Sequence, residues 1–554
     1  MRQTDSDGGR TGRQAKVLWR RISRITAATA AIVAGLAGLS MADAPAASAS
    51  ISETVIVTST GLLSPVQAVL DVGGTVLTQF HIINGVQATI LTLTEPVLDA
   101  LPGITVTPDL TVNVQSVPVS TGPHTPSDAY LRETGATQLA TGGDTGQGVA
   151  VAVLDTGIDQ LPDFAGRLIG GVDLSGGNNP YQDSYGHGTF VAGLIAGNGA
   201  SSNGQYSGEA PGARLVSIKV AGATGTTHLS TLILGLQWAV DQRAILGIKV
   251  LNISLGFSTV LSTVINPLDQ AVEAAWNSGI AVIVSAGNAG PFNGTILSPG
   301  DDPLVVTVGA LDDMATRPQA DDEITDFTSA GPTATDGWVK PDLVTSGRSV
   351  VSLAAPGSTI YNSYPSARIG SGNFVGSGTS FSAAIASGAA ALVLADNPGL
   401  TPNQVKAMLL GNADPGPIGN PFVDGHGTLD AEAAATSSPM DISQSAGGGL
   451  LPTLYGATVS LLPDGSADTW NSSLWSPTPS GQSFVYNWNG DNWNGDDWNG
   501  YAWVGKAWNE GAWNGATWDG AAWEGKAWND AGWTGSSWTG TAWVGKAWNQ
   551  SAWS

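Results

Sequence analysis

The chain has 554 residues, more than one ordinary domain, and its 42% hydrophobic content is enough for at least one large core. Cysteine is absent, which excludes disulfides, thiolate metal sites and a cysteine nucleophile. The formal net charge of −24 argues against nucleic acid as a partner, because phosphate binding relies on clustered lysine and arginine.

Residues 1–50 predict an export signal. Basic residues between Arg10 and Arg24 precede the apolar run ITAATAAIVAGLAGL, and small-residue triplets such as Ala47-Ser48-Ala49 follow it. A membrane anchor is the alternative, but the run is short and rich in Ala and Gly for a bilayer span of about 20 strongly apolar residues. We therefore expect a secreted, extracellular protein.

Residues 51–122 predict a small separate unit. Up to about residue 115, strand and helix patterns alternate in the order βαββαβ, with a hairpin across Asn84-Gly85 and ITVTPDLTVNV as the final strand. The stretch VPVSTGPHTPSD that follows is rich in Pro, Ser, Thr and Gly, which is typical of an exposed linker.

Residues 123–436 predict an α/β domain. Apolar strand patterns such as GVAVAVLD, ARLVSIKV and GIAVIVSAGN alternate with helical ones such as STLILGLQWAVDQRA and FSAAIASGAAALVLADN. Continuous apolar strands separated by helices indicate a parallel sheet covered by helices on both faces. In such sheets the functional groups gather at the carboxyl ends of the strands.

The C-terminal part consists of a linker, residues 437–482, and a repeat tail, residues 483–554. Tryptophan recurs every five residues from Trp488 to Trp553, and the AWxGKAWN motif recurs every 20 residues. Four pentads per unit predict a four-sided β-solenoid in which the tryptophans pack against each other. The alternative is a module whose exposed tryptophans bind the cell envelope.

A seryl nucleophile needs a base and a group that orients the base. The stretch SGTSFSAAIASG offers four serines, and the tetrapeptide G-H-G-T occurs at both His187 and His426. His187 begins the small-residue helix FVAGLIAG, whereas His426 precedes LDAEAA, which predicts a surface turn. Asp155 ends the strand VAVAVLD and Asn288 ends GIAVIVSAGN, so both are expected at the carboxyl edge of the sheet.

The motifs VLDTGID, GHGTFVAG, SAGNAG and SGTSFSAA occur in that order. With ISLG, VKPDLV and LTPNQVKAMLLGNA, they make residues 128–436 similar to the subtilisin-like serine proteases, the subtilase family, peptidase S8. The resemblance implies a subtilisin-like fold and an endopeptidase acting on proteins or peptides. It also implies that residues 51–122 are an inhibitory propeptide, with an independent accessory domain as the alternative.

The resemblance assigns roles to separated residues. Asp155 orients His187, the general base, and Ser380 is the nucleophile, while the Asn288 side chain and the Ser380 N–H form the oxyanion hole. Ser254, Leu255 and Gly256 correspond to the strand that pairs with substrate backbone, and Ala286 and Gly287 line the pocket for the residue before the scissile bond, with Leu297 near its base.

Two departures from the family pattern bear on the site. Phe190 replaces the second histidine of G-H-G-T-H-V-A-G, and Ala384 stands where proline is usual, four residues after the nucleophile. Neither change removes a catalytic atom, although Ala384 should loosen the start of its helix slightly.

No cofactor is required for the predicted chemistry. Subtilases often bind structural calcium, and the acidic loops LPDF and NNPYQDSYG contain oxygen ligands, but the sequence assigns no ligand set.

Two other functions remain as alternatives. One is a catalytically silent binding protein on the same fold. The other is a hydrolase with the order Ser, Asp, His that would recruit His426, although Ser380 lacks the final glycine of G-x-S-x-G and Asp424 is close to His426 in sequence.

Overall fold

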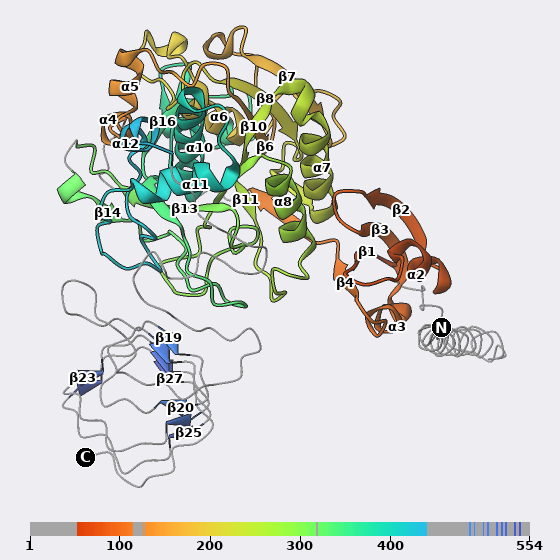
Figure 1. Cartoon of the computed structure of the whole chain (residues 1–554). Helices are drawn as coiled ribbons and strands as arrows, with labels where there is room; N and C mark the ends of the chain where they lie inside the picture. Colours follow the sequence, from red (N-terminus) through yellow and green to blue (C-terminus); the bar gives the residue numbers. More distant parts are fainter. Residues whose placement is uncertain are drawn as a thin grey trace, which may run out of the picture. The chain divides into compact units, whose positions relative to one another are not determined.

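The computed structural model describes residues 52–114, 126, 128–316 and 319–439, together with nine two-residue strands between Asn487 and Trp543 (Figure 1). The predicted export signal, the end of the predicted propeptide and most of the linker before the tail therefore lie outside the described residues. Contacts divide the chain into two compact units, Met1–Gly447 and Gly448–Ser554, so residues 52–114 group with the α/β domain that follows them.

The first unit begins with a four-stranded antiparallel sheet in the order β2-β3-β1-β4, and its element order βαββαβ is the predicted one. One face of the sheet packs on two short helices around buried Val57, Ile90 and Leu98. The elements are β1 (Ser52–Ser59), α2 (Pro65–Asp71), β2 (Thr75–Phe80), β3 (Gly85–Leu91), α3 (Glu95–Asp99) and β4 (Ile104–Pro108).

The final strand of this unit differs from the prediction. ITVTPDLTVNV is interrupted after Pro108, and its second half forms β5 (Thr111–Val114). Strand β5 leaves the small sheet and lies between β9 (Thr226–His228) and β11 (Leu255–Gly256), antiparallel to both. Sequence alternation cannot show this, because it indicates a strand without identifying its partner.

The α/β domain contains an eight-stranded sheet, parallel except for the short edge strand β14. The path is β14-β13-β12-β10-β6-β8-β7, and β15 also pairs with β13. The strands are β6 (Ala150–Asp155), β7 (Leu168–Asp173), β8 (Arg214–Lys219), β10 (Ile248–Ile253), β12 (Ala281–Ser285), β13 (Val306–Asp312), β14 (Glu323–Ile324) and β15 (Leu343–Ser346).

Helices cover both faces of this sheet, as predicted (Figure 1). Helices α7 and α8 pack on one face, and α6, α10 and α11 pack on the other, with α12 against α10. The helices are α4 (Tyr130–Glu133), α5 (Ala136–Gly142), α6 (His187–Ala196), α7 (Leu229–Leu246), α8 (Pro267–Asn277), α9 (Thr359–Ser363), α10 (Thr379–Asp396), α11 (Pro402–Gly411) and α12 (Ala431–Thr436). A small sheet contains β16 (Val350–Leu353), β18 (Asn373–Gly376) and β17 (Arg368–Ile369).

Helix α10 passes through the interior of the domain. Its small residues permit close packing, and at Gly388 a Cβ would lie 2.4 Å from Glu209 Cβ. Among the described residues, α10 is the one helix long and apolar enough to cross a membrane, but 89% of that window is buried in the protein, as expected of a core helix.

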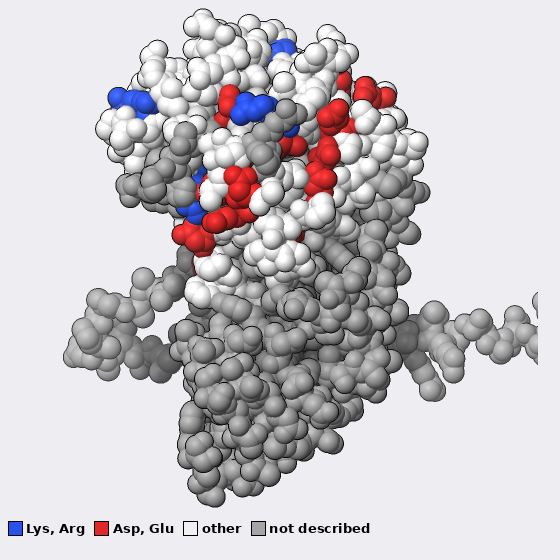
Figure 2. All heavy atoms as spheres, turned by 90° about the vertical axis from the view of Figure 1, so that its left-hand side faces the viewer, with Lys and Arg blue, Asp and Glu red and all other residues white. Residues whose placement is uncertain are grey.

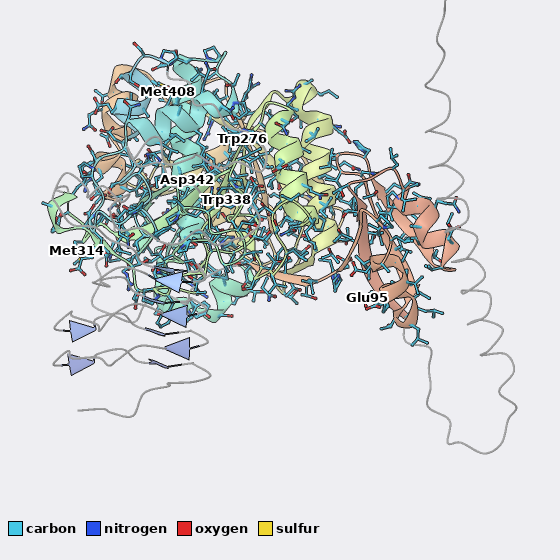
Figure 3. The ribbon with its side chains drawn as sticks, turned by 60° about the horizontal axis from the view of Figure 1, so that its bottom comes forward. Glu95, Trp276, Met314, Trp338, Asp342 and Met408 are labelled. Carbon is cyan, nitrogen blue, oxygen red and sulfur yellow. The ribbon has the colours of Figure 1, made fainter. Side chains whose placement is uncertain are left out.

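Two buried lysines join Asp342, directly before β15, to the loop before β13. Lys406 Nζ donates to the carbonyls of Pro303 and Val305, each at 2.9 Å, and lies 3.2 Å from Asp342 Oδ1. Lys340 Nζ donates to Asp342 Oδ2 at 2.6 Å, and Asp342 lies inside the domain (Figure 3). Burial alone would raise the pKa of the Asp342 carboxyl, but the two ammonium groups outweigh it and lower that pKa below its ordinary value.

The tail contributes strand pairs with a regular register. Parallel partners such as Trp503 and Trp523, or Trp508 and Trp528, lie 20 residues apart, while Trp488 pairs with Trp503. The strands are β19 (Asn487–Trp488), β20 (Asn492–Trp493), β21 (Ala502–Trp503), β22 (Ala507–Trp508), β23 (Thr517–Trp518), β24 (Ala522–Trp523), β25 (Ala527–Trp528), β26 (Ser537–Trp538) and β27 (Ala542–Trp543). The solenoid stays a prediction, because most of the tail lies outside the described residues.

The surface of the first unit carries part of the negative charge. On the face drawn in Figure 2, acidic side chains gather in separate groups with fewer basic side chains among them. This distribution agrees with the net charge of −24.

We predict that Lys406→Met lowers the free energy of unfolding by about 3 kcal/mol, because the buried carbonyls of Pro303 and Val305, and Asp342, lose the Lys406 donor. Urea unfolding followed by tryptophan fluorescence measures the change. Lys249→Met, at an exposed lysine of β10, is the matched control and should shift the midpoint little. Equal midpoints for the two variants would contradict the stabilising role of Lys406.

Candidate active site

A carboxylate and an imidazole form a buried pair at the carboxyl edge of the sheet. Asp155 is the last residue of β6, and His187 is the first residue of α6. His187 Nδ1 lies 2.8 Å from Asp155 Oδ1 and 2.9 Å from Oδ2, and Thr156 N–H also donates to Oδ1. These contacts place the Nδ1 proton on the side of Asp155. His187 Nε2 is buried and has no hydrogen-bond partner among the described residues.

Ser380 lies in the first turn of α10, next to this pair. The ring of Phe381, the following residue, lies 5.6 Å from the His187 ring, centroid to centroid. Ser380 Oγ donates to the carbonyl of Ser254 at 3.2 Å rather than to His187. The backbone N–H of Ser380 is at the N-terminus of an 18-residue helix, where the helix dipole favours negative charge.

Asn288 is held by the residue before Ser380. Its Oδ1 accepts from Thr379 N–H at 2.9 Å and from Thr379 Oγ1 at 3.0 Å. Because both partners are donors to Oδ1, the amide must present its Nδ2 donor on the other side. Thr379 Oγ1 in turn accepts from Gly287 N–H at 3.2 Å. Thr379 therefore connects both Gly287 and Asn288, in the loop after β12, to α10.

The predicted substrate-binding edge is occupied by the chain itself. Leu255 pairs with Val114, and Gly256 pairs with Asn113 of β5. Ser254, just before them, is fully buried, and its hydroxyl lies 2.9 Å from Asn252 Oδ1 and 3.1 Å from the Ser380 carbonyl.

The predicted pocket-lining residues also come together. A Cβ at Gly287, whose φ is +110°, would lie 2.7 Å from Leu297 Cγ, and a Cβ at Gly256 would lie 3.1 Å from Leu297 Cβ. Leu297 N–H donates to the carbonyl of Ala286 at 3.0 Å. Leu297 therefore packs between the strand edge and the Ala286-Gly287 wall, and both glycines are needed for this close approach.

The other candidates for the nucleophile and the base have different partners. Ser377 Oγ accepts from Ser349 N–H, Ser382 Oγ donates to the carbonyl of Thr345, and Ser387 Oγ donates to the carbonyl of Ala383. His426 is half-buried, and its backbone N–H donates to the carbonyl of Asp342. Asp342 is far from Asp155 in the chain. Burial lowers the pKa of the His426 imidazole. Ala384 is fully buried within α10.

In the two loops predicted to contain oxygen ligands for calcium, the carboxylates accept hydrogen bonds from other protein groups. Asp183 accepts from Thr156 Oγ1, Gly186 N–H and Thr189 N–H, and Asp163 accepts from Ser201. Among the described residues, no group of three or more His, Asp or Glu side chains is arranged to hold a metal ion. Structural calcium, which also binds backbone and amide carbonyls, stays a prediction, and we derive no step through it.

Comparison with protein families identifies relatives of this domain. The family model for the subtilases, peptidase S8, matches residues 146–456. The chain belongs to the subtilase family. The matched region is a serine endopeptidase domain of the subtilisin type.

Three similar proteins illustrate the relationship. Serine protease AprX of Bacillus subtilis is 43% identical over 293 residues, which are 52% of this chain and 66% of AprX. Subtilisin Savinase of Lederbergia lenta is 35% identical over 292 residues, 53% of this chain and 92% of Savinase. The crystal structure of fervidolysin from Fervidobacterium pennivorans, described as a keratinolytic enzyme related to subtilisin, matches with a TM-score of 0.55 and 24% identity. It covers 70% of this chain and 61% of that one, and shows the fold alone. The chain thus spans less than two thirds of AprX and of fervidolysin.

Sequence reasoning missed the residues that support the site. Thr379 lies in the motif SGTSFSAA, but the sequence alone assigns it no role. A second support links Asn252, whose Nδ2 donates to Ser387 Oγ at 3.0 Å, with Ser254. Motif spelling gives no signal for the contacts of Thr379 with Asn288 and of Asn252 with Ser387, because their partners are 91 and 135 residues apart in the chain.

We predict that Thr379→Val lowers kcat for peptide hydrolysis about tenfold with little change in KM, because Asn288 Oδ1 loses the hydrogen bond from Thr379 Oγ1. Thr379→Ser, which keeps the hydroxyl, should restore most of the rate. A Thr379→Val enzyme with unchanged kcat would show that the Thr379 hydroxyl is not needed to position Asn288.

Proposed function

We propose that the protein is a secreted serine endopeptidase that uses Asp155, His187 and Ser380 and is made as a self-inhibited precursor. The observation that carries the proposal is the buried Asp155–His187 pair with Nε2 directed away from the carboxylate, next to the turn that holds Ser380. A silent binding protein would have no need to bury a carboxylate and an imidazole together, at a substantial desolvation cost.

In the proposed reaction, the Ser380 hydroxyl exchanges its hydrogen bond with the Ser254 carbonyl for one with His187 Nε2. Oγ attacks the peptide carbonyl while His187 accepts its proton, and Asp155 stabilises the imidazolium that forms. The oxyanion accepts hydrogen bonds from Asn288 Nδ2 and the Ser380 N–H. His187 then protonates the leaving amine, and water releases the acyl group by the reverse sequence.

The same proposal assigns residues 51–122 as the inhibitory propeptide. Its strand β5 fills the edge at Leu255 and Gly256, where substrate backbone would pair. Asp109 supports this docking, since its Oδ1 accepts from Ser230 N–H at 2.8 Å in the first turn of α7 and its Oδ2 accepts from Ser230 Oγ at 2.7 Å.

Export, the substrates and the C-terminal tail are also part of what we propose. The pattern of residues 1–50 supports export, and the substrates are proteins or peptides. For the tail we favour a self-packing structural repeat over an envelope-binding module, which is supported by strand partners 20 residues apart.

We predict that Ser380→Ala abolishes both peptide hydrolysis and covalent labelling by a fluorophosphonate probe, because the probe reacts with the activated hydroxyl. Labelling is read by gel fluorescence. Retained labelling of Ser380→Ala would contradict the assignment of Ser380 as the nucleophile.

The two G-H-G-T histidines provide the matched pair of variants. His187→Ala should reduce kcat by several orders of magnitude, whereas His426→Ala should keep most of the activity. The opposite result would favour the alternative hydrolase with the order Ser, Asp, His.

We also predict that processing depends on Ser380. The wild-type protein should lose residues up to a point after Val114, while Ser380→Ala keeps the N-terminal unit, as measured by intact mass and N-terminal sequencing. Adding a trace of wild-type enzyme to Ser380→Ala tests whether cleavage also occurs between molecules. Removal of the unit from Ser380→Ala alone, in purified form, would contradict self-processing.

A further inference from the structure

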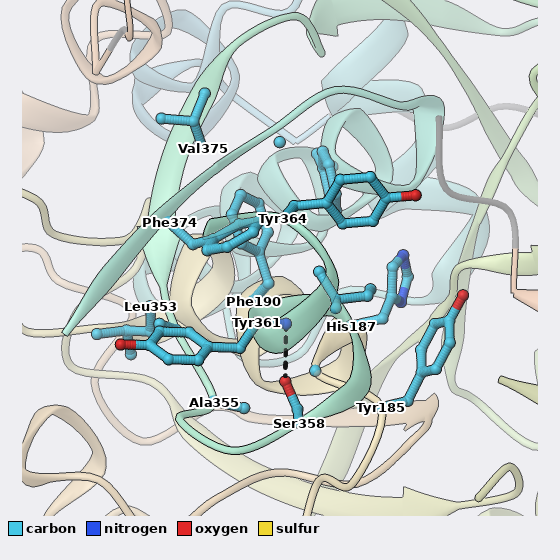
Figure 4. A pocket seen from close by; sticks show the side chains of 15 residues that line it. Tyr185, His187, Phe190, Leu353, Ala355, Ser358, Tyr361, Tyr364, Phe374 and Val375 are labelled. Atoms are coloured by element: carbon cyan, nitrogen blue, oxygen red, sulfur yellow. Dashed lines mark hydrogen bonds between the residues drawn. The ribbon is translucent and has the colours of Figure 1, made fainter. Parts of the chain in front are cut away.

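An aromatic cavity opens beside His187 (Figure 4), and no residue of β5, β9 or β11 lines it. The cavity is partly open to solvent. Six aromatic side chains contribute to its walls, together with His187, and no lining side chain is Asp, Glu, Lys or Arg. The aromatic residues are Tyr185, Phe190, Tyr361, Tyr364, Phe374 and Phe381.

The walls of this cavity are held in place. The rings of Phe190 and Phe381 lie 4.4 Å apart, and the rings of Tyr361 and Phe374 lie 6.4 Å apart. Behind Tyr361, the Arg368 guanidinium stacks at 3.9 Å from the ring centroid. Ser358 Oγ accepts from the Tyr361 N–H, which fixes the start of α9 (Figure 4). A preformed apolar cavity binds an apolar group at low ordering cost.

The cavity lies on the leaving-group side of the reaction centre. The acyl side of a substrate would follow β5, between β9 and β11, and neither strand contributes to the cavity. Ser254, directly before β11, accepts from Ser380 Oγ, and Phe381, the residue after Ser380, lines the cavity beside His187. Val114 N–H donates to the Gly225 carbonyl, and a Cβ at Gly225 would lie 2.5 Å from the Tyr185 ring. The path of β5 thus ends at the rim of the cavity.

We propose that this cavity binds the side chain of the substrate residue just after the scissile bond and selects a large apolar, preferably aromatic, residue there. The inference rests on the proposed endopeptidase function. Apolar walls favour such a side chain by burial and ring contacts, and they disfavour a carboxylate or ammonium group, which would lose its hydration without gaining a charged partner. Phe190, at the position of the missing second histidine, makes this wall apolar.

Partitioning of the acyl-enzyme isolates this site from the acyl side. With one ester substrate, water and an added amino-acid amide compete for the same acyl-enzyme. The amine nitrogen attacks the acyl carbon, the bond to Ser380 Oγ breaks, and the amine proton passes through His187 Nε2 to Oγ. The ratio of peptide to acid product then measures how well each amide occupies the leaving-group site.

We expect phenylalanine amide to capture the acyl-enzyme at least about tenfold better than alanine amide, and aspartic acid amide to capture it worst. Tyr364→Ala, at a residue 39% exposed and therefore tolerant of change, should reduce the Phe-to-Ala capture ratio several-fold. Tyr206→Ala removes a half-exposed tyrosine that does not line the cavity and should leave the ratio unchanged.

Equal capture of the three amides, or equal effects of Tyr364→Ala and Tyr206→Ala, would overturn the inference while leaving the endopeptidase intact. Folded protein that neither hydrolyses the ester nor reacts with the fluorophosphonate probe would overturn the proposed function, and this inference with it.

Discussion

The buried contact between Asp155 and His187 is the interaction on which the rest of the site depends. A carboxylate with no exposed surface is stable only when hydrogen bonds replace its lost hydration, and here the imidazole and the Thr156 N–H supply them. In return, the carboxylate fixes the tautomer of the ring and directs Nε2 toward the reaction centre. The sheet provides the fixed end of this contact, because Asp155 is the last residue of a strand paired on both sides.

The second requirement is that α10 lies deep enough to bring Ser380 to this pair. Small residues along the helix allow that depth, and buried polar contacts fix its position. Asn252 in the middle of the sheet donates to Ser387, and Ser254 lies within reach of the Ser380 carbonyl. The first turn of α10 also holds Asn288 through Thr379. Ser380, the proposed nucleophile, and the candidate oxyanion donors are therefore positioned by the same helix terminus, which limits their relative movement.

Two regions with different chemistry meet at this centre. On one side, backbone groups of β9 and β11 pair with an extended strand and depend little on its side chains, and β5 occupies them. On the other side, a cavity of aromatic rings has almost no backbone pairing to offer. An enzyme built this way would select by size and polarity at the residue after the scissile bond, as well as at the residue before it, where Ala286, Gly287 and Leu297 form the predicted pocket.

The sequence by itself determined the elements and the candidate reacting groups. Apolar strand patterns predicted the parallel sheet, because strand length and helix period are local properties, and four separated motifs pointed to Asp155, His187, Asn288 and Ser380 through their resemblance to the subtilases. It did not determine that ITVTPDLTVNV divides after Pro108, that Thr379 holds Asn288, or that six aromatic side chains from α6, α9, β18, α10 and adjoining loops line one cavity. Those features depend on contacts between residues that are far apart in the chain. Only the packing of helices on the sheet decides which of these residues meet.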